Sequence, residues 1–309
     1  MKKKYPVGIQ NFEKIRSDNY CYIDKTELIY QMAKSGQYYF LSRPRRFGKS
    51  LLISTLEAYF QGKKDLFKGL AIENIENEWI EYPILHLDLN NQKYDAPEKL
   101  YEILNDALCR WEHLYGDSES ETSLSLRFQG VIRRAEEKTG KKVVVLIDEY
   151  DKPMLQAIGN EDLLDDFRNT LKAFYGTLKS SDRYLKFAFL TGVTKFSKVS
   201  VFSDLNNLMD ISIDNRFANI CGVTEEELYC NFKEDIIELG QNNGMTEKET
   251  KAHLKEMYDG YHFVENSDDI YNPFSILNTF AKMKFGSYWF ETGTPTFLVE
   301  LLKLSRYRL

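Results

Sequence analysis

Arg43-Pro44-Arg45-Arg46-Phe47-Gly48-Lys49-Ser50 follows the apolar run Tyr38-Tyr39-Phe40-Leu41, and this stretch decides the fold. An apolar run that leads through Gly-Lys-Ser into a helix is typical of a strand that delivers a phosphate-binding loop. The helix is indicated by apolar residues that fall at i, i+4, i+7 and i+8 on one face: Leu52, Leu56, Tyr59 and Phe60. Lys49 and Ser50 are therefore expected at a helix N-terminus, where free backbone N–H groups and the helix dipole favour an anion.

The first glycine of the general loop pattern is replaced in this chain. That pattern is G-x-x-x-x-G-K-[S/T], and the residue five positions before Gly48 is Arg43. Arginine does not give the tight turn that glycine gives, so the loop is expected to differ in conformation. Since short motifs recur by chance, Gly-Lys-Ser alone also fits a basic loop before an ordinary helix. In the phosphate-loop interpretation nine consecutive residues contact the nucleotide: Arg43, Pro44, Arg45, Arg46, Phe47, Gly48, Lys49, Ser50 and Leu51.

Composition describes a soluble chain with room for one large domain or two. Its 309 residues are 43% hydrophobic, which is enough for a sizeable core, and no segment approaches the roughly 20 apolar residues of a membrane helix. A formal charge of -6 argues against a surface that binds nucleic acid throughout. The four cysteines form no C-x-x-C pair, and no apolar segment follows the basic N-terminus as in a signal peptide. We therefore expect reduced thiols and a cytoplasmic location.

Strand and helix patterns alternate over the first two thirds of the chain. Apolar runs predict strands at 38–41, 82–89, 142–147, 184–191 and 208–213, and periodic segments predict helices at 25–35, 97–115, 123–138 and 162–180. This alternation predicts an α/β fold with a parallel sheet and right-handed crossovers. From about residue 221 the pattern changes to helices with capping-box starts at Thr224 and Thr246. We expect an α/β domain over 1–220 and a helical, lid-like subdomain over 221–309.

A second motif, Asp148-Glu149, directly follows the strand predicted at 142–147. Ligands of open α/β sheets bind at the carboxyl ends of the strands, where the phosphate loop is also expected. Asp148 is then a candidate Mg²⁺ ligand together with Ser50, and Glu149 a candidate for orienting and deprotonating the attacking water. The alternative is a loop whose carboxylates cap a helix or pair with arginine.

Several further polar residues are candidates at the same edge. The chain has no N-K-x-D base-reading loop, and the residue three after Asp148 is Asp151 rather than glycine, so ATP is expected in preference to GTP. Thr191 ends the strand after the acidic one, a position from which it can reach the γ-phosphate or the water. Helix capping or solvation is the alternative for Thr191 and for its neighbours Thr194, Lys195 and Ser197.

Four arginines suit the clamping of a γ-phosphate, although surface solvation or a salt bridge fits each equally well: Arg43, Arg45, Arg46 and Arg216. The aromatic residues between Tyr258 and Phe290 fit a stacking platform for single strands, but core or interdomain packing fits them better, because basic residues are not interleaved with them.

With both motifs in view, the chain resembles the AAA-ATPase-like family of bacterial and archaeal proteins. The matching pieces span most of the chain: 22–26, 40–50, 146–151, 191–197, 258–261, 271–275 and 288–293. The resemblance includes arginine at the position of the first loop glycine. It implies a P-loop NTPase of the additional-strand class and, in longer relatives, a C-terminal domain similar to PD-(D/E)xK nucleases. A nuclease-like domain or other protein partner and a nucleic-acid role therefore rest on the resemblance alone.

Two functions are carried forward from the sequence. One is an Mg²⁺-dependent ATP-binding and ATP-hydrolysing module that switches or powers an attached or partner domain, with Lys49 neutralising the β- and γ-phosphates. The other is a module that binds nucleotide or protein without hydrolysis.

Overall fold

A five-stranded parallel sheet forms the centre of the molecule. The computed structural model describes residues 3–194, 207–264 and 269–293. The strands follow the order β2-β3-β4-β1-β5, so β4 lies between β1 and β3. Their bounds are β1 Tyr38–Ser42, β2 Ile84–Asp88, β3 Val143–Asp148, β4 Leu185–Gly192 and β5 Met209–Asp210. The predicted α/β class with a parallel sheet is confirmed.

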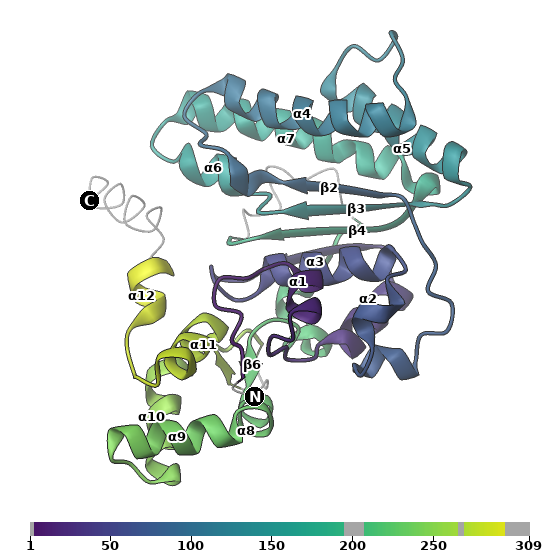
Figure 1. The fold of residues 1–309 in the computed structure, drawn as a ribbon. Helices are drawn as coiled ribbons and strands as arrows, with labels where there is room; N and C mark the ends of the chain where they lie inside the picture. The colour runs from purple at the N-terminus through teal and green to yellow at the C-terminus, as the bar shows by residue number, and fades with distance from the viewer. Residues whose placement is uncertain (1–2, 195–206, 265–268, 294–309) are drawn as a thin grey trace.

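Helices cover both faces of this sheet (Figure 1). One face carries α4 (Pro97–Tyr115), α5 (Leu124–Thr139), α6 (Lys152–Gln156) and α7 (Glu161–Ser180). The other face carries α1 (Phe12–Ser17), α2 (Thr26–Ser35) and α3 (Lys49–Phe60). All six residues of β3 are buried, as its unbroken aliphatic sequence predicts for a strand with helices on both sides. Each face has its own apolar core.

One local prediction needs correction. The segment 208–213, predicted as a strand, pairs only at Met209 and Asp210 and then turns into the 3₁₀ helix η5 (Ile211–Ile213), because the Asp210 carboxylate accepts a hydrogen bond from the Ser212 amide. The helix predicted at about 25–35 is present as α2 (Thr26–Ser35), and Asp24 accepts hydrogen bonds from the Thr26 amide and hydroxyl. The remaining 3₁₀ helices are η1 (Lys64–Phe67), η2 (Ala71–Asn74), η3 (Leu89–Asn91), η4 (Asp182–Tyr184) and η6 (Asn215–Phe217).

The C-terminal part packs as a smaller, mostly helical subdomain beside α1 and α3 (Figure 1). Its elements are β6 (Val223–Thr224), α8 (Glu225–Asn231), α9 (Lys233–Asn243), α10 (Glu247–Tyr258), β7 (Ile270–Tyr271), α11 (Pro273–Lys282) and α12 (Tyr288–Gly293). Both predicted capping boxes are present. The antiparallel pair β6–β7 joins Val223 to Tyr271 and Thr224 to Ile270, and it was not predicted. Tyr5 and Cys21 of the N-terminal segment pack against the core of this subdomain.

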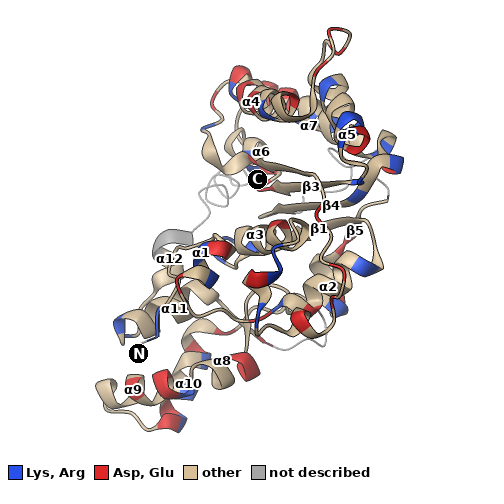
Figure 2. Ribbon diagram, turned by 45° about the vertical axis from the view of Figure 1, so that its right-hand side comes forward, with Lys and Arg blue, Asp and Glu red and all other residues tan. Residues whose placement is uncertain are grey.

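Charged residues lie mainly on the outer helices. Figure 2 shows acidic and basic segments interspersed along α4, α5 and α10. Among the described residues, none of the helices combines the length and apolar character that a membrane crossing requires.

Candidate nucleotide site at the phosphate loop

Three predicted segments meet at the carboxyl edge of the sheet. Leu41 and Ser42 of β1 pair with Thr191 and Gly192 of β4, and Ile147 of β3 pairs with Leu190. The segment 43–48 leaves β1 at this edge, and Asp148 and Glu149 leave β3 there. Parallel pairing alone therefore brings the basic loop, the two carboxylates and Thr191 together, as the sequence predicted.

The loop ends at Gly48 in a backbone conformation that favours glycine. Gly48 caps α3 with φ of 93°, a left-handed conformation that a side chain strains. Lys49 is only 4% exposed, and its Nζ donates to the carbonyl oxygens of Arg43 and Pro44 at 3.1 and 3.3 Å. The same Nζ lies 3.1 Å from Oε1 of Glu149. A lysine folded back over the loop thus faces a carboxylate that lies 100 positions later in the chain.

A polar cavity of about 360 Å³ opens over the loop and the start of α3. Four cationic side chains line it, Arg45, Arg46, Lys49 and Lys152, against the single carboxylate Glu149. The other lining residues are Gln10, Gly48, Ser50, Leu51, Asn90 and Gln156. The excess of positive charge at a helix N-terminus suits a polyanion.

Lys152 also lines this wall, although it was not predicted as a site residue. It is the first residue of α6, and its Nζ donates to Oδ1 of Asn90 at 2.6 Å. Burial lowers the pKa of Lys152, and nearby Arg45 adds to this effect, while Glu149 opposes it. The available signal was its place four residues after Asp148, in the turn that follows an acidic strand end. Gln10 lies in a loop and Asn90 in η3, and their sequence surroundings carry no comparable signal.

The acidic turn holds its two carboxylates in different surroundings. Asp148 is 4% exposed, and its Oδ1 accepts a hydrogen bond from the hydroxyl of the fully buried Thr191. Glu149 has φ of 54°, a sparsely populated conformation for a residue other than glycine. This backbone directs Glu149 into the cavity toward Lys49, while Asp148 stays against the sheet.

Asp151 connects the turn that follows β3 to the segment after β4 through hydrogen bonds. Its carboxylate accepts hydrogen bonds from the amides of Val193 and Thr194 and from the Thr194 hydroxyl, the latter two at 2.7 Å. Burial, with a contribution from Glu149, raises the pKa of Asp151 to about 6. A side chain on Gly192 would meet the Tyr150 ring at 2.5 Å, so the two segments approach this closely only because residue 192 is glycine. Thr194 is thus bound to Asp151, and Lys195 and Ser197 lie outside the described residues.

The Arg43 guanidinium points into the protein interior and does not line the polar cavity. Arg43 is 1% exposed, and its guanidinium donates to the carbonyl oxygens of Ser212 and Ala218 at 2.9 and 3.3 Å. It stacks 3.9 Å from the centre of the Phe263 ring. Burial away from any carboxylate in contact lowers its pKa to about 10. Because the Arg43 side chain is buried and hydrogen-bonded to Ser212 and Ala218, it anchors the start of the loop to the protein interior.

Arg216 is also placed away from the cavity. It lies on η6 with an exposed side chain and pairs with Asp214, the nearest oxygen 2.6 Å away. Arg45 and Arg46 are the two arginines that reach the cavity wall.

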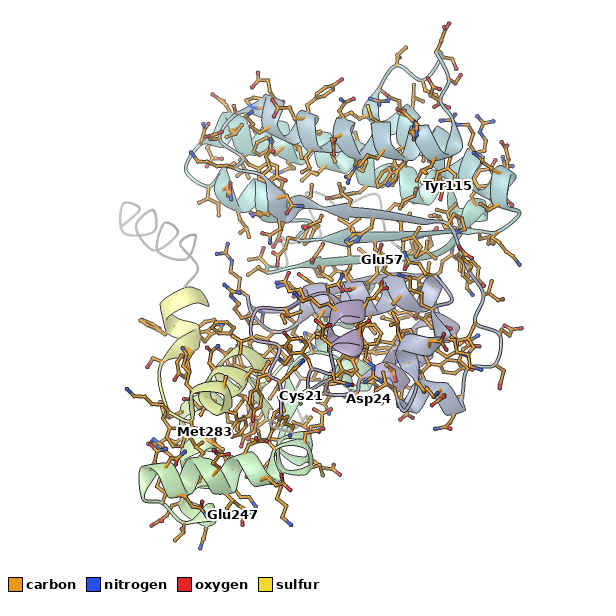
Figure 3. All side chains as sticks on the ribbon, in the orientation of Figure 1. Cys21, Asp24, Glu57, Tyr115, Glu247 and Met283 are labelled. Atoms are coloured by element: carbon orange, nitrogen blue, oxygen red, sulfur yellow. The ribbon has the colours of Figure 1, made fainter. Side chains whose placement is uncertain are left out.

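A second, apolar pocket of about 90 Å³ lies on the other side of the loop and shares Gly48 and Leu51 with the polar cavity. It is formed by the N-terminal segment, α2, α3, the segment 220–223 and α11. Its remaining lining residues are Pro6, Cys21, Tyr22, Ile23, Lys25, Ile29, Phe47, Leu52, Thr55, Ile220, Cys221, Gly222, Val223, Pro273 and Leu277. Figure 3 labels Cys21 at this junction. Burial raises the pKa of the Cys221 thiol, which keeps the pocket wall uncharged there.

The sheet and its flanking helices define an α/β protein with a P-loop-like fold. The chain belongs to the AAA-ATPase-like family, because the family model, described as a predicted AAA-ATPase, matches residues 6–202. It is 41% identical over 302 residues to a protein of Azotobacter chroococcum mcd 1 described as an uncharacterized protein in the vnfD 5' region. The match covers 97% of this chain and 56% of that relative, so the chain spans little more than half of the relative's length. No solved structure matches the chain.

Proposed function

We propose that the chain is an Mg²⁺-dependent module that binds and hydrolyses ATP and switches or powers an attached or partner domain. The observation that carries this proposal is the pairing of Lys49 with Glu149, 3.1 Å apart, inside a cavity with four cationic side chains at the N-terminus of α3. The position of β4 between β1 and β3 supports the additional-strand class of P-loop NTPases.

Each residue has a role that follows from its place. Lys49 and the backbone N–H groups at the start of α3 bind the β- and γ-phosphates, with Arg45, Arg46 and Lys152 adding positive charge. Glu149 orients the attacking water and accepts its proton, and the phosphate oxygens compete with Glu149 for Lys49. Thr191 acts on Asp148 through its hydroxyl, which fixes the carboxylate that it contacts.

The residues present fit a magnesium ion. The Ser50 hydroxyl and the Asp148 carboxylate supply the hard oxygen ligands that Mg²⁺ takes, and both lie at the edge of the sheet where the phosphates are expected. The ion would neutralise charge on the phosphates when bound. Thr191 holds Asp148 Oδ1, so the ligand is oriented in advance.

We assign the apolar pocket to the base of the same nucleotide. It begins at Gly48 and Leu51, where the polar cavity ends, and its wall is mostly aliphatic and uncharged. Cofactor sites typically combine an apolar wall with a few polar groups. The volume of about 90 Å³ is smaller than an adenine ring requires, so binding has to widen the junction between α3 and the helical subdomain. This supports a lid-like movement of that subdomain.

Phosphate release tests the enzymatic proposal. We expect turnover by the native chain, loss of turnover in Lys49→Ala, and loss of turnover with retained ATP binding in Glu149→Gln. Equal background rates in all three proteins would refute hydrolysis.

A module that binds nucleotide without hydrolysis is the second candidate. The same Lys49–Glu149 ion pair also favours this candidate, because a carboxylate that is paired with Lys49 is less available to act as a base. ATP binding without phosphate release in the native chain would select this candidate. The attached domain is proposed from the length of the relative, and a nuclease-like or nucleic-acid role is tested by DNA binding that weakens as salt is raised.

A further inference from the structure

The late aromatic residues pack directly against the phosphate loop. Tyr261 and Phe263 contact the Phe47 ring edge-to-face, with ring centres 4.6 and 5.5 Å apart. The guanidinium of Arg46 lies 4.8 Å from the centre of the Phe274 ring. Helical-subdomain side chains therefore cover the outer side of a loop whose inner side faces the polar cavity.

Trp289 adds a directional contact to this packing. Its indole Nε1 donates a hydrogen bond of 2.9 Å to the carbonyl oxygen of Arg45, 244 residues earlier in the chain. The Trp289 ring also lies edge-to-face against Tyr261, with centres 6.0 Å apart. Arg45 and Arg46 line the polar cavity, whereas Trp289 does not. The indole thus contacts the loop from outside the polar cavity.

This hydrogen bond sets the direction of a backbone donor. In a trans peptide the carbonyl oxygen and the following N–H point in opposite directions. Fixing the Arg45 oxygen on the indole therefore turns the Arg46 N–H away from Trp289. Arg46 has φ of 68°, a conformation that costs a non-glycine residue free energy and persists only where its surroundings enforce it.

The geometry points to Trp289 as a positioning residue for phosphate binding, supported by Tyr261. This inference rests on the proposed function, because it assigns the loop to ATP. The helical subdomain holds the loop in its phosphate-accepting conformation, a task for which the general pattern uses glycines. Because coupling between two contacts is reciprocal, phosphate binding also stabilises the contact between the loop and Trp289.

Trp289→Phe tests this role, since it keeps a smaller aromatic ring beside Tyr261 and removes the indole donor. We expect ATP and inorganic triphosphate, measured by calorimetry, to bind roughly three- to tenfold more weakly, as loss of one hydrogen bond predicts. Tyr261→Leu should weaken both ligands as well. The matched control is Trp111→Phe, a tryptophan stacked on Phe128 within the α4–α5 layer, which should leave both affinities unchanged.

Tryptophan fluorescence provides a readout that a merely structural role would not move. ATP should change the emission of the native chain and of Trp111→Phe but not that of Trp289→Phe. Native affinity together with the native fluorescence change in Trp289→Phe would overturn the inference while leaving the proposed function intact. Absence of ATP and triphosphate binding by the native chain would refute the proposed function and this role with it.

Discussion

The two cavities on either side of the phosphate loop differ in volume, charge and polarity, although they share two lining residues. The larger one, about 360 Å³, is lined by four cations and one carboxylate, and the smaller one, about 90 Å³, is mostly aliphatic. Gly48 and Leu51 belong to both. A nucleotide has the same division between a highly charged end and a flat, weakly polar end. The difference between the cavities therefore supports one ligand that spans the loop, with its phosphates on the charged side and its base on the apolar side.

The polar side should carry the chemistry, and Glu149→Gln removes it most directly. Glutamine keeps the shape of the side chain but cannot accept the proton of the attacking water. We expect the rate of phosphate release to fall by about 10²- to 10⁴-fold, the usual contribution of a general base. ATP affinity should remain or improve, because Lys49 is freed from its carboxylate partner. Unchanged turnover would show that Glu149 is not the base.

Lys49→Ala should produce the next largest effect, on binding. The substitution removes the charged donor from the phosphates, and hydrogen bonds to charged groups contribute about 1.5–3 kcal/mol. ATP should bind about 10- to 150-fold more weakly in calorimetry. The control is Lys63→Ala, a lysine paired with Glu13 on the surface, which should bind ATP as the native chain does. Equal losses in the two variants would contradict the assignment of the polar cavity.

Asp151 is buried next to the polar cavity, and its titration should change the free energy of unfolding with pH. Its carboxyl has a pKa of about 6 in the folded chain, against 3.8 for the ordinary group. Between about pH 4 and pH 6 the folded state holds the proton more firmly, so this residue makes the free energy of unfolding fall as pH rises, by ~3 kcal/mol in total. Asp151→Asn should remove that component.

Urea unfolding of the native chain and Asp151→Asn at several pH values measures this effect. The difference between the two proteins should change between about pH 4 and pH 6 and stay constant above about pH 7. A difference that is independent of pH would show that burial does not raise the Asp151 pKa.

The apolar side is tested by Leu277→Trp, which narrows the pocket at a half-buried position of its wall. A base that no longer fits should cost about tenfold in ATP affinity, the equivalent of ~1.4 kcal/mol. Inorganic triphosphate has no base, so its affinity should be unchanged. Equal weakening of ATP and triphosphate would break the proposed division between the cavities.

The sequence predicted those parts of the site that follow from local pattern and from the geometry of parallel sheets. Gly48, Lys49 and Ser50 start a helix after a strand, and Asp148 and Glu149 end a buried strand, so the shared carboxyl edge could be expected before any coordinates. The direction of Arg43 could not be expected, because it depends on Ser212 and Ala218, far along the chain.

The remaining features depend on contacts that no local pattern encodes. Gln10, Asn90 and Lys152 line the cavity from three separate segments. The β6–β7 pair has only two residues in each strand, too few for an alternating pattern to be recognised. The predicted strand over 208–213 failed because one hydrogen bond from Ser212 to Asp210 competes with the sheet.

Stability of the native chain as a function of ATP concentration, with Mg²⁺ present, tests the central claim most directly. At a free ATP concentration of 100 times the Kd, the free energy of unfolding should rise by about 2.7 kcal/mol if ATP binds only the folded state. Lys49→Ala should show little of this rise at the same concentration. No rise in the native chain at saturating ATP and Mg²⁺ would contradict the account, because the phosphate loop would then not bind the nucleotide that its charge and geometry indicate.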